Sequence, residues 1–135
     1  MKVVFDSNVI ITAFSTRGLC SELFENCILN KQIIISEFIL CEVEEKLIKK
    51  IKLLKKIVYE IIEYLRNTFS LVEPGFRDSN ICRDKNYLKI IGTAMAGNPQ
   101  IIITGDKDLL ILKQYKKIKI VSPISSVSLN SKAHM

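Results

Sequence analysis

Short runs of β-branched residues alternate with longer segments of helical periodicity, and this alternation constrains the fold more than any other feature of the sequence. The strand-like runs are residues 2–5, 32–35, 71–72, 100–104 and 117–123. Between them, apolar residues recur at intervals of three and four, as on one face of an amphipathic helix. Strands that alternate with helices form a mostly parallel sheet covered on both faces. We therefore predict a three-layer α/β/α sandwich.

The expected helices can be placed from periodicity and capping signals. Helical spacing covers residues 21–29 and 86–97, and Ser36 is a plausible N-cap for a helix that opens at Glu37. From Lys46 to Phe69, the apolar spacing fits either one long amphipathic helix or two joined helices. A further helix precedes the last strand.

The length of 135 residues and the hydrophobic content of 48% suit one packed core. We expect a single domain over residues 1–123 and a poorly ordered polar tail over residues 124–135. No apolar run approaches the length of a bilayer span, and the first residues do not resemble a signal peptide. The expected location is therefore the cytoplasm, without a membrane partner.

The cysteines and the histidine argue against a zinc site. The chain has four cysteines, none in a Cys-x-x-Cys pair, and its one histidine is His134. Cys20 and Cys27 are seven residues apart, which places them on one face of a helix, and buried, reduced thiols are their expected state.

The formal net charge of +6 suits a polyanionic partner such as nucleic acid. The lysines gather around residues 46–56 and again around residues 113–119. Lysine runs are also typical of solvated surfaces. Charge therefore favours a nucleic acid over a small apolar ligand, but it leaves open whether these lysines contact one.

Two of the strand-like runs end close to acidic residues. Asp6 follows the run at residues 2–5, and Asp106 follows the run at residues 100–104 after one glycine. The carboxyl ends of parallel strands meet at one edge of a sheet, so both carboxylates are expected at the same crevice. A carboxylate beside a buried strand must be hydrogen-bonded or hold a cation. The pair predicts a divalent-cation site, with turn or helix capping as the alternative role of each acid.

Glu42 is the third candidate acid. By helical spacing it borders the apolar face of residues 36–48, whereas Glu44 and Glu45 fall closer to the solvent side. Glu42 is therefore the acid of this helix that is best placed to reach a cleft. An exposed helix charge is its alternative role.

Four motifs resemble, in order, the signatures of PIN domains. They are residues 5–9 (Phe-Asp-Ser-Asn-Val), 36–42 (Ser-Glu-Phe-Ile-Leu-Cys-Glu), 82–84 (Cys-Arg-Asp) and 103–110 (Ile-Thr-Gly-Asp-Lys-Asp-Leu-Leu). The resemblance runs from Lys2 to about Pro123, and the first and last motifs together are its most specific part. The subgroup that the chain most resembles is described as toxin components of toxin–antitoxin systems.

This resemblance implies an endoribonuclease that depends on Mg²⁺ or Mn²⁺, with a cognate antitoxin as partner and a homodimer as assembly. It assigns catalytic, metal-binding roles to Asp6, Glu42 and Asp106. Asp108 would be an auxiliary metal-binding acid, and Asn8 and Thr104 would be supporting polar residues. Hard divalent ions prefer oxygen ligands and lower the pKa of bound water, so hydrolysis of RNA phosphodiesters would need no histidine or lysine as base.

The family pattern breaks at Tyr87. PIN domains normally carry an acid at the start of the helix before the Thr-Gly-Asp motif, and counting back from Asp106 places Tyr87 there. A phenol with an ordinary pKa of about 10 cannot replace a carboxylate at neutral pH. Asp84, one turn earlier, either supplies a metal-binding carboxylate or caps the helix. The break predicts one-metal binding with reduced nuclease activity, and Tyr87 is expected to point toward the site.

Two other functions compete with the ribonuclease. The first is a catalytically weakened PIN-like domain that binds RNA or a protein partner. The second is a phosphotransfer receiver, which needs a phosphoacceptor aspartate after a middle strand. No aspartate occurs between Asp6 and Asp78, so the receiver is disfavoured.

Overall fold

The computed structural model describes residues 1–73 and 85–126, without the side chains of residues 85–89. The elements in chain order are β1 (Lys2–Phe5), α1 (Ser7–Ser15), α2 (Leu19–Asn30), β2 (Gln32–Ser36), α3 (Glu37–Lys49), α4 (Lys55–Thr68), β3 (Ser70–Val72), α5 (Lys85–Gly97), β4 (Ile101–Ile103), α6 (Lys107–Leu112), β5 (Gln114–Tyr115) and β6 (Ile118–Val121). Within the described residues, the strands form one sheet in the order β3-β2-β1-β4-β6-β5.

The sheet is parallel except at one edge. Strand β1 lies between β2 and β4, and every neighbouring pair from β3 to β6 is parallel. Only the short β5 runs antiparallel, against β6. The predicted mostly parallel sheet is confirmed, although the sequence analysis expected no β5–β6 hairpin.

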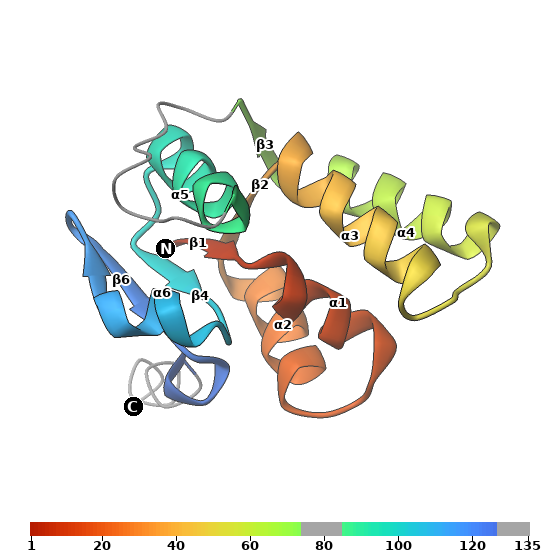
Figure 1. The fold of residues 1–135 in the computed structure, drawn as a ribbon, viewed down its shortest axis with the longest axis horizontal. Helices are drawn as coiled ribbons and strands as arrows, with labels where there is room; N and C mark the ends of the chain where they lie inside the picture. Colours follow the sequence, from red (N-terminus) through yellow and green to blue (C-terminus); the bar gives the residue numbers. More distant parts are fainter. Residues whose placement is uncertain (74–84, 127–135) are drawn as a thin grey trace.

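Helices cover both faces of this sheet (Figure 1). The end of α5 lies on the face of Ile34, because a Cβ at Gly97 would stand only 2.6 Å from the Ile34 Cγ2 atom. Val4 of β1 pairs with Ile34, so the next residue, Phe5, points to the opposite face of the sheet. There its ring packs edge-on against the ring of Phe24 on α2, with 5.3 Å between the ring centroids. The three-layer α/β/α architecture is therefore confirmed.

The helix that follows β2 begins where the capping signal predicts. The Ser36 Oγ accepts a hydrogen bond from the Ile39 N–H at 3.4 Å and shares a 2.6 Å hydrogen bond with the Thr93 hydroxyl on α5. The amphipathic stretch from Lys46 to Phe69 contains the end of α3 and the whole of α4, with a break between them at residues 50–54. Of the two arrangements expected there, the structure has two helices.

The core consists of the strands and the helix faces above them. Strand β2 is buried from Ile33 to Ser36, and all of β4 is buried. Such continuous apolar strands are typical of a parallel sheet that is covered on both sides. The apolar run at residues 9–14 lies within α1.

The chain after β6 continues as one helical turn at residues 123–126, and Ser126 is buried there. Residues 127–135, most of the expected tail, lie outside the described part. No helix among the described residues is long and apolar enough to cross a membrane.

Candidate functional site

The register between β1 and β4 brings Asp6 and Thr104 together. Phe5 pairs with Ile103, so the chain leaves the sheet at neighbouring points. The Asp6 N–H donates to the Ile103 carbonyl at 2.9 Å, and the Thr104 Oγ1 donates to the Asp6 Oδ2 at 2.7 Å. Thr104 is completely buried, so this hydroxyl holds the carboxylate at the carboxyl edge of the sheet.

Asp106 joins the same edge through Thr104. The Thr104 Oγ1 accepts a hydrogen bond from the Asp106 N–H at 3.0 Å. The Asp106 Oδ1 accepts from the Asp108 N–H at 2.9 Å and thereby caps α6. Asp106 thus has the capping role that the sequence left open for it, while Asp108 is exposed on the first turn of α6.

Asp6 stands at the N-cap position of α1, but its carboxylate lacks the well-formed capping hydrogen bond that Asp106 makes, and the Asn8 N–H interacts with it only weakly. Its second oxygen, Oδ1, accepts a 3.4 Å hydrogen bond from the Ser7 hydroxyl. Burial raises the pKa of Asp6 above its ordinary value, and the negative charges of Glu42 and Asp106 raise it further, while the Thr104 hydroxyl and the Asn8 N–H lower it. The other two candidate acids are therefore close enough to repel Asp6.

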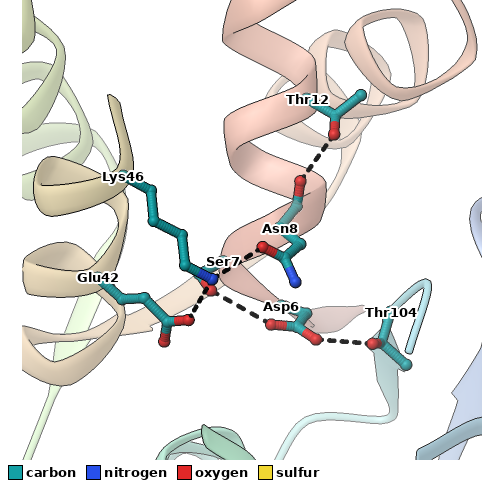
Figure 2. Close-up of polar contacts among 7 residues, drawn as sticks. All are labelled: Asp6, Ser7, Asn8, Thr12, Glu42, Lys46 and Thr104. Atoms are coloured by element: carbon teal, nitrogen blue, oxygen red, sulfur yellow. Dashed lines mark hydrogen bonds and ion pairs between the residues drawn. The ribbon is translucent and has the colours of Figure 1, made fainter. Parts of the chain in front are cut away.

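Glu42 reaches this edge from α3, which starts at the carboxyl end of the adjacent strand β2. Its side chain is only 10% exposed, whereas the side chain of Glu45 on the same helix is 64% exposed. Lys46 lies beside Glu42 (Figure 2). The Lys46 Nζ is 2.9 Å from the Glu42 Oε1 and donates a hydrogen bond to the Asn8 Oδ1 at 3.1 Å. Asn8, on the first turn of α1, is thereby linked to α3.

A model of the PIN domain family matches residues 2–108. This chain belongs to the PIN domain family. The match covers most of the chain and includes every candidate acid of the site.

Two solved structures resemble this PIN domain in fold. One is VapBC2 from Rickettsia felis, whose structure was solved bound to a DNA fragment from the VapBC2 promoter. It is 14% identical to this chain, with a TM-score of 0.62, and the match covers 90% of this chain and 98% of that chain. The other is VapBC-1 from nontypeable Haemophilus influenzae, with 17% identity, a TM-score of 0.62 and coverage of 92% and 99%. No curated protein sequence matches the chain significantly.

The structure brings together Asp6, Glu42 and Asp106, which we call the acidic cluster, and places Asn8 and Thr104 next to it. Asp84 lies outside the described residues. Tyr87 lies in α5, but its side chain is not among those described, so the direction in which it points stays a prediction.

The donor set of the acidic cluster fits Mg²⁺ or Mn²⁺ chemically, because carboxylate, amide and hydroxyl oxygens are the ligands that these ions take. In the described part of this PIN domain, however, no three acidic, histidine or cysteine side chains converge closely enough to hold an ion as they stand. In this arrangement, the carboxylates of Glu42 and Asp106 repel that of Asp6, and the ammonium of Lys46 pairs with Glu42.

Sequence reasoning missed two polar neighbours of the acidic cluster. Lys46 belongs to a lysine-rich stretch that is typical of a solvated surface, but its position four residues after Glu42 is the spacing of a helical ion pair. Ser7 follows Asp6 directly, but only the turn from β1 into α1 aims its hydroxyl at the carboxylate.

Proposed function

We propose that this PIN domain is a Mg²⁺- or Mn²⁺-dependent endoribonuclease that acts as the toxin of a toxin–antitoxin pair. The observation that carries the proposal is that Asp6, Glu42 and Asp106 lie at the carboxyl edge of the sheet, near enough for Glu42 and Asp106 to raise the pKa of Asp6. Structural ion clusters elsewhere on a surface would not need a carboxylate held at a buried strand end. The family of the chain and its fold likeness to two VapBC structures support the same function.

In this proposal, each residue of the site has a defined task. The bound ion would polarise the scissile phosphate and supply an activated water for hydrolysis. Asp6, Glu42 and Asp106 would hold the ion, and Asp84 and Asp108 would be auxiliary acids. The Thr104 hydroxyl orients Asp6 and fixes the turn that presents Asp106, while Asn8 supports the side nearest to Glu42. An RNA substrate would place the activity in the cytoplasm.

The test is cleavage of single-stranded RNA with Mg²⁺ or Mn²⁺ by the wild type and by conservative amide variants. Asp6→Asn and Glu42→Gln should each lower the rate about 100-fold or more, because they remove a charged ligand without changing side-chain size. Glu45→Gln is the matched control, since Glu45 is an exposed acid on the same helix, and it should cleave like the wild type. Asp106→Asn can still cap α6, so a loss of activity in that variant would separate metal binding from helix capping.

The alternative is a catalytically weakened domain that binds RNA or a protein partner, and one observation favours it: a lysine already neutralises one acid of the cluster. The same assay distinguishes the two functions. RNA retention that survives EDTA, with no cleavage under any metal condition, would contradict the nuclease and support the binder.

We extend the proposal to the partners. A cognate antitoxin and a second copy of the chain are both protein surfaces, and apolar side chains exposed on α4 support contact with a protein. They are Ile57, Tyr59 and Tyr64, which are 43%, 67% and 45% exposed.

A further inference from the structure

Lys46 joins two elements of the site through its ammonium group. The Nζ donates to the Glu42 Oε1 at 2.9 Å on its own helix and to the Asn8 Oδ1 at 3.1 Å on α1 (Figure 2). The lysine side chain is 31% exposed and the glutamate side chain 10%. Both acceptor atoms are oxygens of residues assigned to the candidate metal site.

A second ion pair on α3 shows what the helical spacing alone produces. Lys49 and Glu45 are also four residues apart, with the Nζ 3.3 Å from the Oε1, but their side chains are 74% and 64% exposed. Within residues 1–73 and 85–126, Lys49 contacts no oxygen from a second element. The contact with Asn8 and the burial of Glu42 therefore distinguish Lys46 from an ordinary surface ion pair.

We propose that the Lys46 ammonium is a built-in cation of the acidic cluster that competes with a divalent ion for Glu42. This inference rests on the proposed function, because it assumes that Glu42 is a metal ligand. A divalent ion at Glu42 and an ammonium at hydrogen-bond distance from the same carboxylate repel each other, so the lysine must leave when the ion binds. Its flexible four-carbon stem and partial exposure allow this movement.

Competition has a direct consequence for metal affinity. Every ion that binds must break the contacts of Lys46 with Glu42 and Asn8. The free energy needed to break them is subtracted from the free energy of ion binding, so the apparent affinity for the ion is lower. Without a bound ion, the ammonium offsets the repulsion between Glu42 and Asp6. Lys46 thus sets the metal concentration at which the site fills.

The test is Mn²⁺ titration of the full chain by calorimetry. Lys46→Met keeps the apolar stem and removes the charge, and it should tighten Mn²⁺ binding about tenfold. Lys49→Met, the matched control, should bind like the wild type, and Lys46→Arg should bind no more tightly than the wild type. As a second readout that needs no variant to fold, the ammonium NMR signal of Lys46 in the wild type should shift on titration with Mg²⁺.

The outcomes separate this inference from the proposed function. Asp6-dependent Mn²⁺ binding by the wild type with equal or weaker binding by Lys46→Met would overturn the role of Lys46 and leave the metal site standing. An unmoved Lys46 ammonium signal at saturating Mg²⁺ would overturn it as well. Failure of every protein to bind either ion would overturn both proposals.

Discussion

Asp6 is the residue on which the candidate site depends most. It is partly buried at the end of the central strand β1, and it lies near two other carboxylates. Burial and like charge both disfavour its ionised form, and hydrogen bonds from neighbouring groups offset only part of this effect, so its pKa remains above the ordinary value of 3.8. A folded chain that keeps a carboxylate in such a place gives up stability unless a cation compensates it.

The raised pKa of Asp6 predicts a pH-dependent cost. Asp6 binds its proton more tightly in the folded chain than in the unfolded one, so its contribution to stability is present below pH 3.8 and is lost as the pH rises through the raised pKa. Asp6→Asn cannot ionise. In EDTA, the free energy of unfolding of Asp6→Asn should therefore exceed that of the wild type by an amount that grows from pH 3.8 up to the raised pKa of Asp6. Above that pKa, the difference should stay constant up to neutral pH.

Urea unfolding of both proteins at a series of pH values measures this difference. Saturating Mn²⁺ serves as the control, because it should stabilise the wild type more than Asp6→Asn if Asp6 is a ligand. A difference between the two proteins that does not change with pH would show that the ionisation of Asp6 carries no cost in the fold.

Among the elements, α3 connects the sheet to the acidic cluster. Its N-cap, Ser36, could be predicted because a serine before a helical apolar pattern satisfies a free backbone N–H. The 2.6 Å hydrogen bond between Ser36 and Thr93 joins residues that are far apart in the sequence, and no local pattern indicates it. This buried contact ties the start of α3 to α5.

Loss of the Ser36–Thr93 contact should appear as coupling between two substitutions. Ser36→Ala and Thr93→Val should each lower the free energy of unfolding by about 1–2 kcal/mol, because each removes the buried hydrogen bond between the two hydroxyls and Ser36→Ala also removes the cap of the Ile39 N–H. The double variant should cost about 1 kcal/mol less than the sum, since both changes remove the same hydrogen bond. Chemical denaturation of the four proteins measures the coupling, and strictly additive costs would contradict it.

On the scale of the whole molecule, the positive charge is divided between two places. Lysines are exposed at the junction of α3 and α4 and again at the β5–β6 hairpin, which lie at opposite ends of the view in Figure 1. The hairpin turn lies at the amino end of β6, whereas the acidic cluster lies beyond the carboxyl ends of the parallel strands. The first group lies at the end of α3, the helix that carries Glu42, and continues to the start of α4.

This arrangement predicts which lysines contact RNA. The triple variant Lys50→Gln, Lys52→Gln, Lys55→Gln should lower the slope of log affinity against log salt by about one or more, because each phosphate contact releases condensed counterions. The matched triple variant Lys116→Gln, Lys117→Gln, Lys119→Gln removes the same charge from the hairpin and should leave the slope close to that of the wild type. Fluorescence anisotropy with a labelled RNA in EDTA measures both slopes, and equal reductions would show that charge acts without regard to position.

The α/β class, the mostly parallel sheet and the family of the chain follow from the amino-acid sequence alone. Strand runs, helical spacing and the Thr-Gly-Asp motif are local patterns, and short-range sterics and backbone hydrogen bonding fix what such patterns become. They also predicted that Asp6 and Asp106 leave the sheet at one edge, because parallel strands present their carboxyl ends together.

Only the tertiary structure decided how those acids are held and what neutralises them. The β1–β4 register placed Thr104 between Asp6 and Asp106, and the packing of α1 beside α3 brought Asn8 to the ammonium of Lys46. The Asn8–Lys46 and Asp6–Thr104 contacts join residues that are 38 and 98 positions apart in the sequence. Helical spacing could indicate the pairing of Lys46 with Glu42, but electrostatic energies depend on distance and burial in three dimensions, so the burial of Glu42 and the contact of Lys46 with Asn8 follow from the fold alone.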